Sequence, residues 1–204
     1  MSAHAAWWTA AILAGGQGRR FGGIDKSQLI VDGQTVLDRQ LAVLRPLTDD
    51  CLLAGGPARE HPAPVRRVAD LHPGLGPLAG LEAALLAARH DIVVAVACDM
   101  PFLDGRLLSH LAELARHHDI VAPQTGRGVH PLCAAYRRAC RPAISARLER
   151  GQLKLTDLFE EMRVHVVSVT DLEVFGDADQ LMTNLNRPDD LAGLQATRLH
   201  GEKF

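Results

Sequence analysis

Apolar residues follow two different spacings along the first 125 residues of the chain. Continuous apolar runs of strand length alternate with longer segments in which apolar residues recur every three or four positions. The runs predict buried strands at 9–13, 51–54, 65–69, 92–97 and 120–122, and the periodic segments predict helices at 35–44, 78–88 and 105–117. Strands that are apolar on both faces are typical of parallel sheets. The alternation therefore predicts a three-layer α/β/α fold, with helices on both faces of a mainly parallel sheet.

The spacing of the predicted strands and helices changes after residue 125. A possible strand at 129–136, a helix at 139–150 ended by Gly151, and an alternating strand at 163–169 follow one another at shorter spacing. We expect these late strands to be antiparallel additions to the main sheet. Because the sequence shows no internal repeat and no linker, residues 1–204 are expected to form a single domain.

Composition and charge narrow the possible partners. The 204 residues are 47% hydrophobic and 23% charged, with a formal net charge of −2 at pH 7. Without an overall basic field, neither nucleic acid nor an anionic membrane is expected as a partner. The longest apolar run, 92–98, is much shorter than the roughly 18 residues of a membrane-spanning helix. No Lys or Arg precedes the first apolar stretch, which leads directly into a glycine loop and is therefore unlike a signal peptide.

The cysteines bear on the redox compartment. Cys51, Cys98, Cys133 and Cys140 show neither C-x-x-C spacing nor metal-type pairing. We expect reduced side chains that pack as small buried apolar groups, in a cytoplasmic protein.

A glycine-rich loop follows the first predicted strand, with five glycines in residues 15–23. It is not a P-loop, because Lys26 follows Asp25 instead of a glycine, and it is not a dinucleotide fingerprint, because Phe21 stands where the third glycine should be. Glycines allow backbone N–H groups to approach phosphates closely, and Arg20 and Lys26 add positive charge. We interpret residues 14–26 as a cradle for a nucleotide polyphosphate; the alternative is a strand-to-helix turn with solvated arginines.

Asp99 comes directly after the apolar run at 92–98, just before Pro101. Its carboxylate is expected at the same sheet edge as the glycine loop, where Mg²⁺ commonly takes one or two carboxylates together with substrate phosphates. The alternative role, capping the next helix, suits Asp104 better. Asp70 ends the preceding predicted strand in a similar way, and the glycine and proline loop at 71–80 suits the close approach of a base or sugar.

Taken together, these motifs resemble those of the molybdenum cofactor guanylyltransferases. The resemblance covers nearly the whole chain and rests on these segments: LAGG at 13–16, Arg20, GG at 22–23, DK at 25–26, GPLAG at 76–80, CDMPF at 98–102, HP at 130–131 and NLNRPDDL at 184–191. It implies a Rossmann-like fold of the nucleotide-diphospho-sugar transferase type. It also implies the transfer of GMP from GTP to the terminal phosphate of molybdopterin or molybdenum-molybdopterin, which yields molybdopterin guanine dinucleotide and pyrophosphate.

The resemblance also implies a set of site residues. Arg20, Lys26 and Asp99 would be catalytic, and Asp99 would bind Mg²⁺ or Mn²⁺. The nucleotide-binding set would be Leu13, Ala14, Gly15, Gly16, Lys26, Ala54, Asp70, Pro77, Leu78, Gly80 and Asp99. His130, Asn184 and Asn186 would lie on the molybdopterin side, so that the part up to about residue 125 binds the nucleotide and the remainder binds the pterin cofactor. Where the family often has Asn near the end of the second strand, this chain has Ala54, so a nucleotide contact there would use the backbone.

Other readings remain open at this point. LAGG at 13–16 resembles the guanylyl version of the motif, whereas cytidylyl relatives more often read LAAG. The alternatives are a cytidylyl- or sugar-phosphate nucleotidyltransferase, or a non-catalytic carrier that binds GTP and molybdopterin. Transient contact with proteins that supply or accept the cofactor is also expected. His130 is either a substrate contact or a hydrogen-bonded histidine at the start of a strand.

Two further groups of side chains allow either a structural or a functional interpretation. Trp7 and Trp8 precede the first strand, so packing of the N-terminal segment is expected in preference to pterin stacking. The arginines at 137, 138, 141 and 147 are expected to form a solvated helix face; the alternative is a surface for the anionic pterin or a partner protein.

Overall fold

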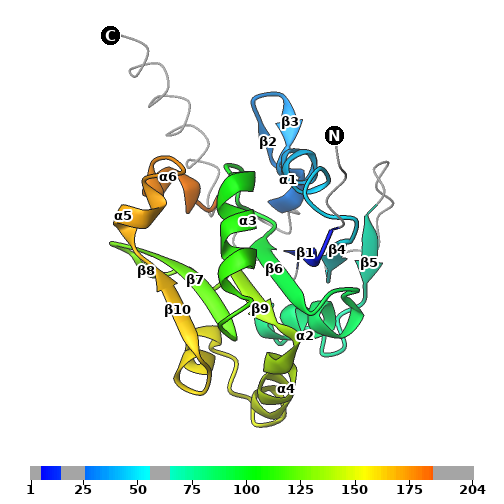
Figure 1. The fold of residues 1–204 in the computed structure, drawn as a ribbon. Coiled ribbons are helices and arrows are strands. Elements are labelled where there is room, and N and C mark those ends of the chain that lie inside the picture. The colour runs from blue at the N-terminus through cyan, green and yellow to red at the C-terminus, as the bar shows by residue number, and fades with distance from the viewer. Residues whose placement is uncertain (1–5, 15–25, 56–64, 186–204) are drawn as a thin grey trace.

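The computed structural model describes residues 6–14, 26–55 and 65–185, which build one large sheet, a small hairpin and the helices that cover the sheet (Figure 1). The strands of the large sheet are β1 (Trp8–Leu13), β4 (Cys51–Ala54), β5 (Arg66–Val68), β6 (Ile92–Ala97), β7 (Ile120–Thr125), β8 (Gly128–Val129), β9 (Cys133–Arg137) and β10 (Val164–Val167). Their order is β5–β4–β1–β6–β9–β7–β10, and β8 pairs with β7. The hairpin consists of β2 (Ile30–Val31) and β3 (Gln34–Thr35).

Strand directions confirm a mainly parallel sheet. β1 lies between β4 and β6 and is parallel to both, and β5 is parallel to β4. β9 is antiparallel to β6 and to β7, as expected for a late addition. The same expectation is wrong for β10, which is parallel to β7. The physical reason is the connection: the chain leaves the end of β9, forms one α-helix flanked by two 3-10 helices, and returns to the same sheet edge to begin β10.

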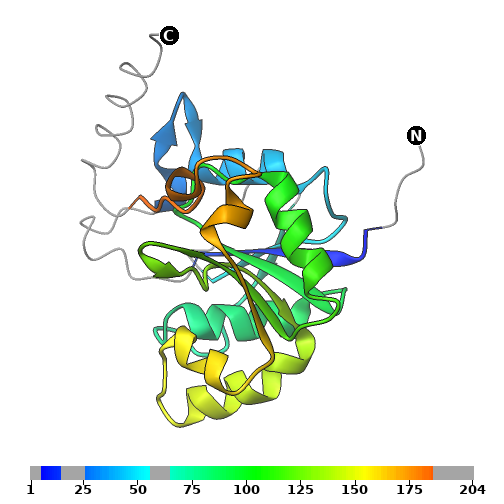
Figure 2. The same ribbon diagram turned by 60° about the vertical axis from the view of Figure 1, so that its left-hand side comes forward.

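Helices cover both faces of the sheet, which confirms the three layers (Figure 2). One face is covered by α1 (Val36–Leu44), α3 (Gly105–Leu114), α5 (Val169–Leu172) and α6 (Ala178–Leu181), and the other by α2 (Pro77–Ala87), α4 (Arg141–Glu149) and the 3-10 helix η4 (Leu155–Glu160). β6 shows why both faces need cover. Ile92, Val94 and Val96 pack into the core on the α3 side, while Val93 and Ala95 pack into the core on the α2 side. Alternate side chains of a fully buried strand thus supply two separate cores.

Two predicted strands differ from those observed. The segment at 65–69 was expected to be buried on both faces, but β5 is an edge strand whose residues are half-buried or exposed. The segment at 129–136 is divided into β8 and β9, because residues 130–132 form a turn between them. The predicted helix at 139–150 starts as a 3-10 turn, η3 (Arg138–Cys140), and α4 follows from Arg141.

The expectation that the arginines at 137, 138, 141 and 147 form one solvated helix face is wrong for Arg147, and Arg137 and Arg138 precede α4. Arg147 is buried, and its guanidinium pairs with Glu161 and, at 3.4 Å, with Asp157. Arg137 pairs with Asp91 at 2.9 Å, and Arg138 donates to the carbonyls of residues 88 and 90. These arginines therefore tie η4 to α4 and the end of β9 to the start of β6.

The N-terminal aromatic pair packs as predicted. Trp8 is a buried residue of β1, and the Trp7 ring packs on the core with the Arg116 guanidinium 4.1 Å from its centroid. All four cysteines are free thiols; Cys133 and Cys140 are buried, whereas Cys51 and Cys98 are half-buried. Burial raises the pKa of the Cys133 and Cys140 thiols to about 12. Over the ranges the structure describes, none of the helices has the length and apolar character needed to cross a membrane.

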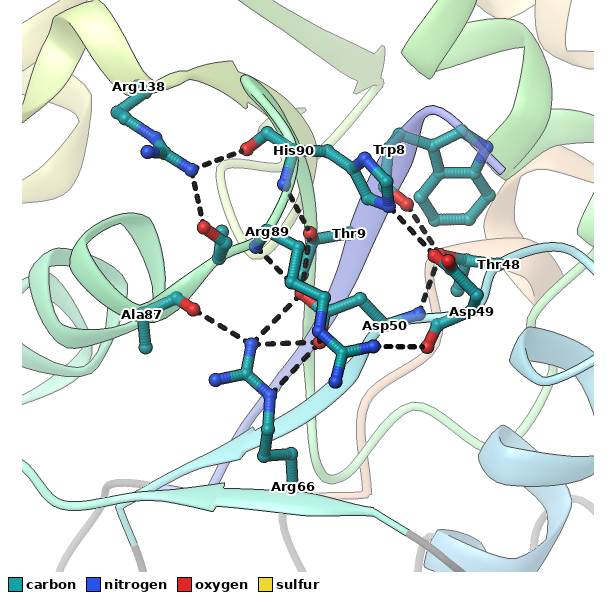
Figure 3. A network of polar contacts seen from close by, with 11 residues as sticks. Trp8, Thr9, Thr48, Asp49, Asp50, Arg66, Ala87, Arg89, His90 and Arg138 are labelled. Atoms are coloured by element: carbon teal, nitrogen blue, oxygen red, sulfur yellow. Dashed lines mark hydrogen bonds and ion pairs between the residues drawn. The ribbon is translucent and has the colours of Figure 1, made fainter. Parts of the chain in front are cut away.

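Asp50 organises the edge of the sheet at which the parallel strands begin (Figure 3). Its buried carboxylate accepts hydrogen bonds from Thr9 Oγ1 at 2.9 Å, from the Arg66 guanidinium at 2.8 Å and from the Arg89 backbone N–H at 2.9 Å. Burial alone would raise the pKa of Asp50, but the hydrogen bonds from Arg89, Arg66 and Thr9 outweigh it and hold the pKa below its ordinary value. One carboxylate thus joins β1, β4, β5 and the segment before β6.

Asp50→Asn is expected to lower the free energy of unfolding at pH 7 by roughly 2 kcal/mol or more, because charge-assisted hydrogen bonds in a buried site are lost. The folded-state pKa of Asp50 lies below the ordinary 3.8, so its contribution is present above about pH 5 and is lost as the pH falls through the lower folded-state value. Urea unfolding of both proteins between acid and neutral pH measures the difference, which should narrow in acid.

Asp49→Asn is the matched control, since it removes the neighbouring carboxylate, which is 62% exposed and pairs with His90. That variant should change stability by well under 1 kcal/mol. Equal losses in the two variants would contradict the role given to Asp50.

Candidate active site

The candidate residues lie along the edge at which the parallel strands end. Leu13 is in register with Ala54 of β4 on one side and with Ala97 of β6 on the other. Asp70 follows β5 beyond β4, and residues 130–132 approach β6 from the opposite side, where Ala97 N–H donates to the Leu132 carbonyl at 2.8 Å. From β5 to β9 the edge spans four strand spacings, or about 19 Å. Asp99 follows β6, which is three strand spacings from β5 and one from β9.

Asp99 and Lys26 form an ion pair at this edge. Lys26 Nζ lies 2.8 Å from Asp99 Oδ2, and the aspartate side chain is 11% exposed. Lys26 opens the 3-10 turn η2 (Lys26–Gln28), so a residue 73 positions away along the chain reaches the end of β6. The structure therefore brings Lys26 and Asp99 together at one site, as the sequence predicts.

The second oxygen of the same carboxylate has a different environment. Asp99 Oδ1 is inaccessible to solvent and accepts no hydrogen bond from the described residues. A buried carboxylate oxygen without a donor is costly unless a cation or a donor completes it. The described residues contain no group of three or more His, Cys, Asp or Glu side chains suited to hold a metal ion. Mg²⁺ in proteins usually takes one or two carboxylates together with oxygens of a bound phosphate.

Leu13, Ala54 and Leu78 can offer only main-chain contacts to a nucleotide. The side chains of Leu13, Ala54 and Leu78 are buried in the core on the α2 side of the sheet. Ala14 N–H donates to the Ala54 carbonyl at 2.8 Å, which fixes the exit of the chain from β1. Gly80 is buried and lies against Leu13, since an added Cβ would be 3.8 Å from its Cδ2.

The amino end of α2 faces the same edge without a side-chain cap. Gly76, at the N-cap position, has a φ of 80°, and no side chain caps the first turn, in which Pro77 is the first residue. Uncapped N–H groups at a helix amino end attract anions and polar ligand groups. This arrangement fits the predicted approach of a nucleotide to residues 76–80.

The C-terminal segment reaches Asp99 through Leu185. Leu185 N–H donates to the Asp99 carbonyl at 2.9 Å, and its buried side chain packs with Val31 and Val36 near the β2–β3 hairpin. Asn184 is therefore next to the strand-end acid, although it is 85 positions away in the chain. The other predicted member of this motif, Asn186, lies outside the described residues, as do Gly15, Gly16 and Arg20.

His130 is a hydrogen-bonded residue in the turn between β8 and β9. Its Nε2 lies 2.8 Å from Thr125 Oγ1, and its N–H donates to the Pro123 carbonyl at 2.8 Å. Burial and the Arg127 guanidinium lower the pKa of His130 below its ordinary value, against a smaller opposing effect of Asp179, so the ring is neutral near pH 7. The hydrogen-bonded reading of this histidine is confirmed; contact with a pterin stays a prediction.

Gln40 is a residue of the site that the sequence reading missed. It is buried on α1, and its Nε2 donates to the carbonyls of Ala97 at 2.7 Å and Met100 at 2.9 Å. These two bonds hold the turn that contains Asp99. A signal was present in the sequence: Gln40 is the one polar member of the stripe formed by residues 36, 37, 40, 41 and 44.

Comparisons with known proteins agree on one family. Residues 10–166 match the family model described as "MobA-like NTP transferase domain". A "Probable molybdenum cofactor guanylyltransferase" of Pelotomaculum thermopropionicum is 34% identical over 184 residues, which are 90% of this chain and 89% of that protein. The "Molybdenum cofactor guanylyltransferase" of Desulfosudis oleivorans is 30% identical, with 92% and 94% covered.

A solved structure shares the fold. The crystal structure of molybdopterin-guanine dinucleotide biosynthesis protein A from Archaeoglobus fulgidus superposes with a TM-score of 0.78 and 26% sequence identity. The superposition covers 94% of this chain and 99% of that one.

Gln40→Met is expected to lower the free energy of unfolding by about 1–3 kcal/mol, because two carbonyls of buried residues lose their donor while side-chain volume is kept. Denaturant unfolding measures the loss. Gln34→Met, at an exposed position of the β2–β3 hairpin, is the control and should leave stability nearly unchanged. An equal effect of the two substitutions would remove Gln40 from the support of the Asp99 turn.

Proposed function

Since the chain belongs to the MobA-like NTP transferase family, we propose that it transfers GMP from GTP to the terminal phosphate of molybdopterin or molybdenum-molybdopterin. The products are molybdopterin guanine dinucleotide and pyrophosphate. The resemblance to molybdenum cofactor guanylyltransferases and the nucleotide-diphospho-sugar transferase type of fold are confirmed by the comparisons. Nucleotidyl transfer in molybdenum cofactor biosynthesis is the class of activity that the relatives' names support.

The observation that carries the proposal is the arrangement at Asp99. A largely buried carboxylate binds a lysine ammonium through Oδ2, and its Oδ1 accepts no hydrogen bond from the described residues. The uncapped amino end of α2 lies at the same edge. Buried charge with an incomplete set of partners is typical of a site that receives a further charged ligand. A nucleoside triphosphate with its cation meets that requirement.

Asp99 fits a divalent cation, since its orphaned Oδ1 is an oxygen ligand of the kind that Mg²⁺ prefers and Mn²⁺ accepts. When bound, the ion supplies positive charge to phosphate oxygens and thereby eases the meeting of two anions. Lys26 would hold Asp99 before the nucleotide arrives and would then neutralise phosphate charge, assisted by Arg20 and the amides of Gly15 and Gly16.

The proposed reaction is an in-line displacement. An oxygen of the terminal molybdopterin phosphate forms a bond to the α-phosphorus of GTP, while the bond from that phosphorus to the bridging β-phosphate oxygen breaks and pyrophosphate leaves. A general base is unnecessary, because a phosphate monoester is already largely ionised at pH 7. The task of the protein is alignment and charge neutralisation by fixed groups.

The two substrates would occupy different parts of the sheet edge. The nucleotide would lie over β4, β1 and the start of α2, near Asp70, Pro77, Leu78 and Gly80. Molybdopterin would lie beyond Asp99, near His130, Asn184 and Asn186. This division corresponds to a nucleotide-binding part up to about residue 125 and a pterin-binding part after it, and it is supported by the position of Asn184 next to Leu185, whose N–H donates to the Asp99 carbonyl.

Incubation of the protein with molybdopterin, Mg²⁺ and each nucleoside triphosphate in turn is expected to release pyrophosphate with GTP and much less with CTP. Pyrophosphate release and chromatography of the dinucleotide product are the measurements, and omission of Mg²⁺ should abolish both. Preference for CTP or for a sugar phosphate would select the related nucleotidyltransferase. Binding of GTP and molybdopterin without product would select the carrier.

Asp99→Asn is expected to lower turnover by roughly 10²- to 10³-fold, because a preorganised charge aimed at the reacting phosphates is removed. Steady-state pyrophosphate release is the measurement. Asp91→Asn is the matched control: Asp91 immediately precedes β6 at the opposite sheet edge, where it pairs with Arg137. Near wild-type turnover of Asp99→Asn would exclude this carboxylate from the chemistry.

A further inference from the structure

Glu82 is the single charged residue of α2, whose sequence is PLAGLEAALLA. Its side chain is 5% exposed and lies where α2 packs on α4. Removing a carboxylate from water is costly unless its partners compensate. An apolar residue, as at the neighbouring positions of this helix, would avoid that cost. The partners of Glu82 therefore indicate what the carboxylate contributes.

The two carboxylate oxygens of Glu82 have different partners. Oε1 accepts a hydrogen bond from the Ser145 hydroxyl of α4. Oε2 is inaccessible to solvent and accepts no hydrogen bond from the described residues, but it lies 3.3 Å from His72 Nε2. This contact has the distance of an ion pair without the alignment of a hydrogen bond. The contact is an ion pair when the imidazole is protonated, and the low exposure of the carboxylate then strengthens the attraction.

His72 is the central residue of the segment that joins β5 to α2. Its backbone N–H donates to Asp70 Oδ1 at 2.9 Å, and its carbonyl accepts from Leu75 N–H at 3.2 Å. The imidazole contacts Glu82. His72 therefore connects Asp70, through its backbone N–H, to Glu82 of α2, through its imidazole.

The rest of this segment has few constraints of its own. Residues 71–74 are exposed, and Leu71 is 52% exposed. Gly74 has a φ of 90° and allows the chain to turn, and Leu75 is the next side chain that packs against the core. A segment with so few buried contacts opens at low free-energy cost unless a specific contact holds it. His72, which contacts Glu82, is one of the residues of this segment.

We propose that Glu82 is a positioning residue for the nucleotide. Through His72 it holds Asp70 and the segment leading to the amino end of α2 in their binding arrangement before the nucleotide arrives. The inference rests on the proposed nucleotide site at Asp70 and residues 76–80. Holding a loop in its bound conformation reduces the ordering cost of binding, so the effect falls on nucleotide affinity and not on the chemical step.

Glu82→Gln is the first test, because the amide has the shape of the carboxylate and keeps an oxygen for Ser145 while removing the charge beside His72. If the segment is then competent a tenth to a fifth of the time, the Kd for Mg²⁺-GTP rises roughly fivefold to tenfold. Titration calorimetry measures the Kd. The kcat at saturating GTP should match that of the wild type.

Two further variants separate positioning from packing. His72→Ala removes the same contact by changing its more exposed partner. This variant should raise the Kd for Mg²⁺-GTP as much as Glu82→Gln does. It tests the proposal even if Glu82→Gln fails to fold. Because both substitutions break one contact, the double variant should bind GTP no more weakly than either single one. Ser145→Ala removes the other partner of Glu82, and should lower the Tm while leaving the Kd unchanged.

Hydrogen exchange in the nucleotide-free protein supplies a readout that requires no ligand. The amides of residues 72 and 75 should exchange faster in Glu82→Gln and His72→Ala than in the wild type. Unchanged exchange, or a wild-type Kd in both variants, would overturn the positioning role. An increase in Kd for Ser145→Ala equal to that for Glu82→Gln would also overturn it in favour of packing. A wild-type protein that binds no GTP would instead overturn the proposed function.

Discussion

Parallel pairing of β1 with β4 and β6 is the constraint on which the candidate site depends. Because these strands run in the same direction, the residues that follow them meet at one edge of the sheet, although they are far apart in the chain. Ala14 follows β1 there, and Asp99 comes shortly after the end of β6. The antiparallel entry of β9 brings the turn containing His130 to the same edge, because that strand begins where its neighbour β6 ends.

Three carboxylates of the described residues are buried, and their partners differ according to position. Asp50, at the edge where the strands begin, is saturated by hydrogen bonds and fixes the sheet. Asp99, at the edge where they end, has one oxygen bound to Lys26 and one that no described residue contacts by a hydrogen bond. Glu82 lies between α2 and α4 and contacts the loop that follows β5. Satisfied buried charge stabilises a fold, whereas unsatisfied buried charge at a sheet edge is available to a ligand.

Most of the sheet could be predicted from the sequence because its signal is local. The runs that became β1, β4, β6 and β7 are apolar on both faces, and this pattern requires two covering layers. The predictions from the sequence were wrong where the burial or direction of a strand depends on its place in the sheet. β5 lies at an edge, so its side chains are less buried than its apolar residues suggested, and β10 is parallel because the chain returns to the edge that it had left.

For the site, the sequence by itself determined which residue types are available and at which strand ends they stand, since glycine spacing and a terminal acid are properties of short segments. Lys26 and Asp99 were identified in this way. Only the tertiary structure decided that they touch, that Leu185 docks on Asp99, and that Gln40 and Glu82 support the surrounding turns. The physical reason is that such contacts join residues that are distant in the chain, and their distances depend on how the helices pack on the sheet.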